Sequence, residues 1–302
     1  TLPMSKSTEV LYYNKTFFEA NNLTVPTTWD ELETVCAQIK AIDPNCIPLG
    51  YDSEANWFIT MCEQMKSGYT SAEDGGKYLF NNDTNKAFVK KLHDMYQKGY
   101  FTTQELYGSY TSNLFVETTD TRCYMCVGSS GGASYQMSNN DTADGKFAFE
   151  VGVAPIPQYN AENRKVISQG PSICIFKNAD TQEVLASWLF AKFLTTDVNF
   201  QASVSMNNGY APVIQSVKNN QVYADFLASA NTANIQAYAV KVALDQANAY
   251  YVSPAFNGSS VAREQVGLLV QKCLVLDSSD VDGAIKKAFE AAVAECKYQS
   301  GQ

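Results

Sequence analysis

Short apolar segments that read as β-strands alternate with amphipathic helices along the chain. The candidate strands are residues 9–13, 47–51, 123–127, 149–154, 166–169 and 173–176. Between them, apolar residues recur at helical spacing, as in residues 88–96, where they fall at i, i+4, i+7 and i+8. Thr28 and Glu31 form the sequence pattern of a capping box, which predicts a helix start. Strands that alternate with helices favour an α/β fold.

Charge and hydropathy exclude several classes of function. The chain has 302 residues and a net charge of −9. An excess of acid repels phosphate backbones, so a general nucleic-acid-binding role is disfavoured. It also disfavours a basic helix that lies on a membrane surface. No run of 18 or more apolar residues occurs in the sequence, so we expect no membrane-spanning helix.

The cysteine and histidine content gives little support for a metal centre. The chain has 8 cysteines and 1 histidine. Cys123 and Cys126 have the C-x-x-C spacing, but they lie on a candidate strand, where residues three apart point to opposite faces. We therefore expect free thiols and no metal site. No Walker A, H-E-x-x-H or G-x-G-x-x-G motif is present, and no cofactor is expected.

A loop of small residues follows the candidate strand at 123–127. Its sequence, Gly128-Ser-Ser-Gly-Gly132, matches the G-x-S-x-G pattern with Ser130 as the nucleophile. A serine hydrolase is a distant alternative, because the one histidine, His93, precedes Ser130 instead of following it. Alternatively, the loop hydrogen-bonds a polar ligand at the carboxyl end of a strand. It can also be a tight turn that binds nothing.

Two segments near the N-terminus carry a resemblance to a known family. Residues 10–20 (VLYYNKTFFEA) and 26–32 (PTTWDEL) resemble the signature of family 1 extracellular solute-binding proteins. These proteins are the ligand receptors of ABC importers for sugars and for glycerol-3-phosphate. Further segments resemble the family in the same order, and they are residues 122–131, 151–157, 170–176, 186–194 and 208–213.

The resemblance implies a type II periplasmic-binding-protein-like fold with two α/β lobes, a hinge and a ligand cleft. Residues 1–168 would form the main part of the second (C-terminal) lobe, and 169–235 the returning part of the first (N-terminal) lobe. Residues 236–302 would supply the hinge return and the C-terminal helices. The family has a longer segment before the LYYNK motif, so we expect an N-terminally truncated chain with an incomplete first lobe. Apolar side chains of that lobe, such as Trp188 and Phe193, should then be exposed.

The resemblance also implies a function and a set of site residues. The protein would be a receptor, not an enzyme, that binds a sugar or oligosaccharide and delivers it to membrane permease subunits. It would lie in the periplasm, or at the extracellular membrane face on a lipid anchor, and be a monomer when full-length. The residues expected to contact ligand are Trp57, Ser129, Ser130, Gly170, Tyr210, Phe256 and Asn257, with Tyr250 and Tyr251 as further rings. Trp57 would be an aromatic platform, with a core residue as the alternative.

A receptor for glycerol-3-phosphate or a glycerophosphodiester is the main alternative. The phosphate-binding members carry an arginine in the late loop near residues 256–257. This chain has arginines at 122, 164 and 263 and none in that loop. Because arginine is the preferred bidentate partner of phosphate, the sequence favours a sugar.

Overall fold

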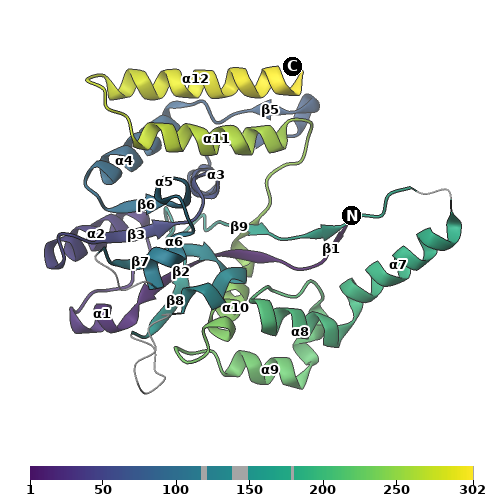
Figure 1. The fold of residues 1–302 in the computed structure, drawn as a ribbon. Coiled ribbons are helices and arrows are strands. Elements are labelled where there is room, and N and C mark those ends of the chain that lie inside the picture. Colours follow the sequence, from purple (N-terminus) through teal and green to yellow (C-terminus); the bar gives the residue numbers. More distant parts are fainter. Residues whose placement is uncertain (117–120, 138–148, 178–179, 302) are drawn as a thin grey trace.

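The computed structural model describes residues 1–116, 121–137, 149–177 and 180–301, and its centre is a mixed β-sheet (Figure 1). The strand order is β11-β9-β2-β7-β3-β6, and β8 also pairs with β2. β3 is parallel to β6 and β7, whereas β2 is antiparallel to β7, β8 and β9. The strands are β2 (Ser7–Asn14), β3 (Ile47–Tyr51), β6 (Phe101–Thr103), β7 (Cys123–Ser129), β8 (Val151–Pro155), β9 (Val166–Gln169) and β11 (Tyr250–Tyr251).

Helices cover both faces of this sheet. One apolar cluster joins the sheet to α2 (Trp29–Ile42), α3 (Glu54–Met65), α4 (Asp83–Gln97), α11 (Ser259–Leu274) and α12 (Val281–Ser300). A second cluster joins it to α6 (Thr111–Val116) and α10 (Ile235–Asp245). The short helix α1 (Lys15–Ala20) follows β2. Within the described ranges, no helix is long and apolar enough to cross a membrane.

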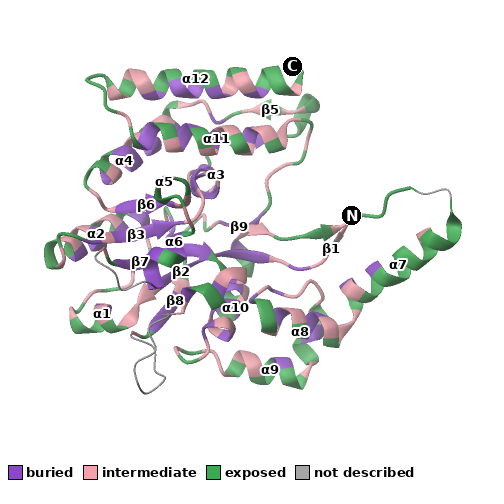
Figure 2. Cartoon of the chain, in the orientation of Figure 1, coloured by how far each residue is buried: buried purple, intermediate pink, exposed green. Residues whose placement is uncertain are grey.

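The alternation of side chains along β2 explains why the sheet is covered twice. Leu11 belongs to the first cluster, whereas its neighbours Val10 and Tyr12 belong to the second. Successive side chains of a strand point to opposite faces, so a strand that is apolar at consecutive positions needs helices on both sides. Figure 2 shows the resulting buried centre beneath helices whose outer faces are exposed.

The predicted capping box is present and fixes the entry into α2. The Glu31 amide donates to the Thr28 hydroxyl at 3.2 Å, and the Thr28 amide donates to the Glu31 carboxylate at 3.2 Å. Two amides that the helix itself leaves unpaired are thereby satisfied. All eight cysteines are free thiols, and only Cys174 is exposed.

Part of the chain leaves the sheet and forms a separate helical group. β1 (Leu2–Pro3) pairs with β10 (Ser172–Ile173), after which come α7 (Thr181–Thr196), α8 (Val198–Asn208) and α9 (Gln221–Ala228). α7 extends away from the body of the molecule (Figure 1). It exposes several apolar side chains, with Trp188 at 45% and Phe193 at 48% relative exposure, which confirms the sequence prediction for these two residues.

The exposed apolar surface of α7 predicts self-association of the 302-residue chain. Contiguous apolar patches on a soluble protein bind other apolar surfaces. We expect the chain to bind an apolar dye and to sediment as an associated species. Replacing Leu189 and Phe190, which are largely exposed, by Glu should reduce both properties, whereas Gln182→Glu at the start of the same helix should change neither. A monomer without dye binding would contradict this prediction.

Candidate functional site

Two hollows adjoin at the carboxyl ends of β3 and β7. The two strands are parallel, so their carboxyl ends meet at one edge of the sheet, where α/β proteins bind ligands. Asp52 follows β3, and its amide donates to the Val127 carbonyl of β7 at 3.1 Å. The Asp52 carboxylate accepts from the Thr111 amide at 2.8 Å and from its hydroxyl at 2.7 Å. Asp52 lines both hollows and joins them into one polar surface.

The first hollow, here called the Tyr210 hollow, has a volume of about 510 Å³. Three tyrosines, two serines and amide side chains line it, together with the glycines of the small-residue loop. Its lining residues include Asp52, Tyr110, Ser112, Asn113, Ser129, Tyr135, Gln136 and Tyr210. The structure therefore brings together two of the residues that the sequence predicts, Ser129 and Tyr210.

The two predicted serines have different environments. Ser129 is exposed, and its hydroxyl accepts from the Gly131 amide at 3.1 Å, which closes the turn after β7. Ser130 is fully buried, and its hydroxyl accepts from the Thr8 amide of β2 at 3.4 Å. The Ser130 side chain is thus used inside the fold and lines neither hollow, and its contact with a ligand stays a prediction.

The hydrogen bonds of Ser130 and His93 also contradict the serine hydrolase alternative. His93 lies on α4 and is buried, with its Nδ1 atom 3.0 Å from the Cys273 carbonyl of α11. The catalytic serine of a triad needs a histidine as its hydrogen-bond partner. Ser130 and His93 each bond to backbone groups elsewhere, so no such pair forms.

Close backbone contacts hold Tyr210 in place. The neighbouring Ala211 exchanges two backbone hydrogen bonds with Lys6, at 3.0 and 2.6 Å. The Tyr210 ring lies so close to Gly131 that a β-carbon there would be 2.8 Å from it. Tyr110 and Tyr135 are two further rings of the hollow that sequence reasoning missed, and Tyr135 is 73% exposed. The sequence feature that could have identified Tyr135 is its position three residues after the small-residue loop.

Trp57 is a core residue that lines neither hollow, and its role as an aromatic platform for a ligand stays a prediction. Its side chain is 1% exposed, and its ring stacks on Tyr51 with a centroid distance of 4.4 Å and an interplanar angle of 6°. The ring also meets the edge of Phe101. An aromatic platform needs a free ring face, and Trp57 has none on the side of the two hollows.

The late aromatic residues also lie away from the hollows. Phe256 packs against Tyr78, with ring centroids 5.8 Å apart, and Asn257 donates to the Ser300 carbonyl at 3.2 Å. Tyr250 donates to the Ala243 carbonyl, and Tyr251 shares a hydrogen bond with Thr60. These four side chains therefore line neither hollow, and their contact with a ligand stays a prediction. They pack at the helices and the sheet edge.

Gly170 marks the crossing between β9 and β10. Its φ angle is +143°, and a β-carbon there would be 2.2 Å from the Ser5 carbonyl oxygen. Glycine is required because the two crossing segments come into backbone contact. The residue thus has a structural role at this crossing and lines neither hollow.

The second hollow, here called the Arg263 hollow, has a volume of about 630 Å³. It lies between the start of α3, the short helix α5 (Gln104–Tyr107), the end of β9 and the start of α11. Its charged and amide side chains are Asp52, Glu54, Asn56, Gln104, Glu105, Gln169, Arg263, Glu264 and Gln271. Arg263 lies six residues beyond Asn257, the end of the loop in which the sequence lacks an arginine.

A buried carboxylate network forms the floor of the Arg263 hollow. The Glu9 carboxylate accepts from the Tyr51 hydroxyl and from the Asn56 amide, each at 2.7 Å. Asn56 and Gln169 exchange two hydrogen bonds of 3.1 Å, and Arg263 donates to the Asn56 carbonyl oxygen. Burial raises the pKa of Glu9 to about 7, although the hydrogen bonds and Arg263 act in the opposite direction.

Burial also raises the pKa values of Asp52 and Glu54, the two carboxyl groups that follow β3. With Glu105 and Glu264, four carboxyl side chains stand against one arginine in this hollow. The Arg263 hollow therefore offers more hydrogen-bond acceptors than cationic donors, which suits a ligand that carries hydroxyl groups.

The fold is that of a solute-binding protein. The chain matches the family described as bacterial extracellular solute-binding protein over residues 1–239, and it belongs to this family. The resemblance noted in the sequence is thereby confirmed.

Curated relatives with similar sequences are sn-glycerol-3-phosphate-binding periplasmic proteins UgpB. The protein from Rhizobium meliloti is 26% identical over 225 residues, which cover 70% of this chain and 49% of the relative. The protein from Escherichia coli K12 is 26% identical over 230 residues, which cover 71% of this chain and 49% of the relative. The chain thus spans about half the length of the curated relatives that it matches.

Solved structures confirm the type II fold. The GacH receptor of Streptomyces glaucescens has a TM-score of 0.75 at 17% identity, with 98% of this chain and 70% of that chain covered. UgpB from Mycobacterium tuberculosis, solved with glycerophosphocholine, has a TM-score of 0.73 at 18% identity, with 97% and 70% covered. A cyclic alpha-maltosyl-1,6-maltose binding protein from Arthrobacter globiformis has a TM-score of 0.71 at 20% identity, with 98% and 72% covered. At these identities the likeness shows the fold alone.

The raised pKa of Glu9 predicts a pH-dependent stability. The folded chain holds this proton up to about pH 7, whereas the unfolded chain releases it near 4.5. The contribution of Glu9 to the free energy of unfolding therefore falls as the pH rises from 4.5 through 7, by up to ~3 kcal/mol. Glu9→Gln should remove this decline, so the variant gains stability relative to the parent between pH 5 and pH 8.

Urea unfolding of parent and variant at both pH values measures the effect. Asp52 and Glu54 titrate in the parent and in the variant alike, so the difference between the two proteins isolates Glu9. An equal stability difference at pH 5 and pH 8 would contradict the prediction.

Proposed function

We propose that this chain is the ligand-binding part of an ABC-importer receptor whose ligand is a sugar or oligosaccharide. The observation that carries the proposal is the Tyr210 hollow, where rings of Tyr110, Tyr135 and Tyr210 surround hydroxyl and amide groups. Sugars have apolar C–H faces and hydroxyl edges. Aromatic rings offer contact area to such faces, and a few polar groups fix the orientation of the ligand.

The charge around the hollows supports a neutral ligand over an anionic one. Asp52 lies between them, and Glu54, Glu105 and Glu264 line the second. Like charges at short range repel in a partly desolvated site, so these carboxylates disfavour a phosphate. The carboxylate oxygens of Asp52 and Glu54 can also accept hydrogen bonds from sugar hydroxyls.

A glycerol-3-phosphate or glycerophosphodiester receptor is the second candidate. It is favoured by Arg263, which the sequence argument placed outside the site but which lines the second hollow. It is also favoured by the names of the curated relatives. Arg263 already donates to Asn56, so a phosphate would have to compete with that contact or use the remaining guanidinium donors.

The remaining features of the receptor are part of the same proposal. A first lobe, of which 169–235 are the returning part, would close over the two hollows by hinge bending. Permease subunits of the importer would then receive the ligand, and the receptor would catalyse no reaction. The family description places such proteins outside the cell. The full-length receptor would lie in the periplasm or on a lipid anchor, and it would be a monomer.

Tyr210→Ala tests the sugar-binding proposal. The variant loses one aromatic contact of about 1–3 kcal/mol, by analogy with stacking on nucleic-acid bases, which corresponds to roughly tenfold or more in affinity. Gly131→Ala should also weaken binding, since its β-carbon displaces the Tyr210 ring. Tyr298→Ala on α12, an exposed tyrosine outside both hollows, is the matched control and should bind like the parent.

Titration calorimetry with a panel of maltose-type sugars and with glycerol-3-phosphate separates the two candidates. Sugar binding should change little between low and high salt, because no ion pair forms. Salt-sensitive binding of glycerol-3-phosphate that Arg263→Gln abolishes, with no sugar bound, would replace the first proposal by the second.

A further inference from the structure

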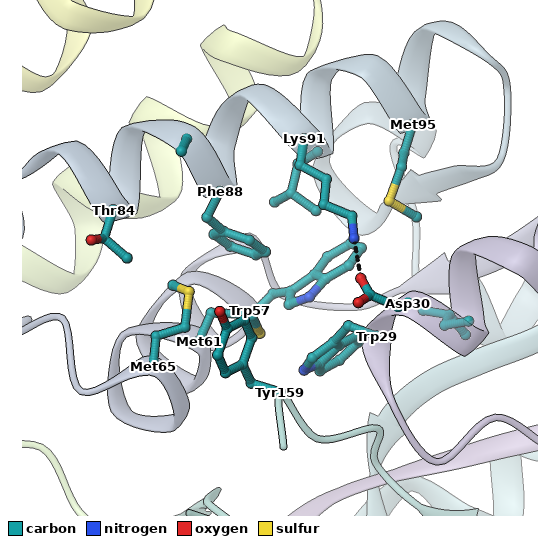
Figure 3. A pocket seen from close by; sticks show the side chains of 13 residues that line it. Trp29, Asp30, Trp57, Met61, Met65, Thr84, Phe88, Lys91, Met95 and Tyr159 are labelled. Atoms are coloured by element: carbon teal, nitrogen blue, oxygen red, sulfur yellow. Dashed lines mark hydrogen bonds and ion pairs between the residues drawn. The ribbon is translucent and has the colours of Figure 1, made fainter.

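A third cavity lies between α2, α3 and α4, apart from the two hollows. It has a volume of about 400 Å³, within the range of small-molecule sites. None of its lining residues lines the Tyr210 or the Arg263 hollow. Its buried wall is formed by Trp29, Trp57, Met61, Phe88, Leu92 and Met95 (Figure 3).

The mouth of this cavity is polar and open to solvent. Asp30, Thr84, Ala87 and Tyr159 are exposed there, and Lys91 is half-buried. The arrangement of a polar mouth over an apolar wall is typical of sites that take an apolar body from water.

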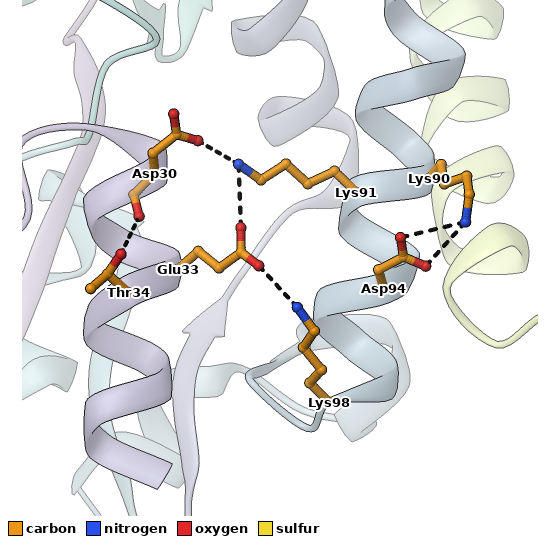
Figure 4. A network of polar contacts seen from close by, with 7 residues as sticks. All are labelled: Asp30, Glu33, Thr34, Lys90, Lys91, Asp94 and Lys98. Atoms are coloured by element: carbon orange, nitrogen blue, oxygen red, sulfur yellow. Dashed lines mark hydrogen bonds and ion pairs between the residues drawn. The ribbon is translucent and has the colours of Figure 1, made fainter. Parts of the chain in front are cut away.

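Ion pairs across the mouth join α2 to α4 and neutralise the charged side chains there. Lys91 on α4 pairs with Asp30 at 2.5 Å and with Glu33 at 3.3 Å, both on α2, and Lys98 pairs with Glu33 at 3.1 Å (Figure 4). The bridges join α2 and α4 at fixed spacing beside the cavity. Since Lys91 is already paired with two carboxylates, the cavity has no free charge to attract an ion, and it favours a neutral ligand.

One polar group of the cavity wall lacks a partner. The indole N–H of Trp57 is fully buried and has no hydrogen-bond acceptor in the described part of the chain. The other tryptophan of the wall differs, because the Trp29 indole N–H donates to Gln64 at 2.8 Å. A buried donor without an acceptor is unfavourable, because its hydrogen bonds to water are lost and not replaced. A single water molecule would be a poor acceptor for this N–H, because a buried water needs two to four polar partners.

We propose that this cavity binds a small neutral molecule with an aromatic body and one carbonyl acceptor, placed so that the acceptor receives the Trp57 indole N–H. The rings of Trp29 and Phe88 and the thioethers of Met61 and Met95 contact the body of the ligand. Sulfur atoms and ring edges both interact favourably with aromatic faces. The site is separate from sugar binding, because its residues contribute nothing to the two hollows.

Benzophenone and 1,1-diphenylethylene form a matched pair of probes for this site. They have nearly the same shape, but only the ketone carries an acceptor. We expect both to bind and the ketone to bind about twofold to tenfold more tightly, as one net hydrogen bond implies. In ¹⁵N-correlated spectra, the ketone should shift the Trp57 indole resonance downfield. The Trp29 indole keeps its bond to Gln64, so its resonance should show no comparable hydrogen-bond shift.

Two variants test whether the probes bind in this cavity. Trp57→Phe keeps a ring but removes the N–H, so the preference for the ketone should disappear. Ala87→Phe at the mouth should weaken both probes alike, whereas Lys90→Phe, on the same helix but outside the cavity, should leave them unchanged. Because Ala87 is exposed, its replacement tests the site even if Trp57→Phe fails to fold. The spectra are recorded in a Trp188→Phe background, which removes the exposed indole of α7.

Absence of binding by either probe would overturn the proposal. So would equal affinities without a Trp57 shift, or binding that Ala87→Phe leaves unaffected. Arg263→Gln, which changes the second hollow, should leave both probe affinities unchanged, and loss of probe binding in that variant would also contradict a separate site.

Discussion

The buried carboxylate of Glu9 fixes the relative positions of the elements that form the candidate site. Its two oxygens accept from Tyr51 at the end of β3 and from Asn56 on α3. Asn56 in turn bonds Gln169 of β9 and Arg263 of α11. A buried charge or acid is tolerated only where such partners are complete. The need to satisfy this group therefore places an arginine and two amides side by side, on elements from three separate parts of the sequence.

Close backbone contacts at two glycines likewise fix the relative positions of the segments that form the Tyr210 hollow. A β-carbon at Gly209 would be 2.3 Å from the Ser130 carbonyl oxygen, and one at Gly131 would meet the Tyr210 ring. The loop before Ala211 thus lies directly on the loop that ends β7. Two segments about eighty residues apart in sequence are held together with little side-chain volume between them, which leaves the hollow open beside them.

Structural features that depend on residues close together in the sequence were predicted well from sequence patterns. Five of the six candidate strands and the capping box at Thr28 depend on neighbours in sequence, and the structure confirms them. The candidate strand at 173–176 is wrong, because the observed strand is Ser172–Ile173. Trp57 could not be placed in this way, because α3 is buried around most of its circumference and shows no single apolar face. Phe256 and Asn257 depend on contacts with β5 (Lys77–Tyr78) and α12, and Arg263 depends on Asn56. These long-range contacts leave no periodic pattern in the sequence.

The packing of Trp57 explains why its N–H group stays without a partner inside the fold. One ring face lies parallel to Tyr51, and Trp29 and Phe101 contact the ring from other directions. Rotation of the indole toward another acceptor would break these contacts, and an off-rotamer position in a close-packed core is itself unfavourable. Tyr51, which carries the stack, is held by its bond to Glu9. The orientation of the Trp57 ring is thus set by the aromatic rings around it and, through Tyr51, by the buried Glu9 side chain.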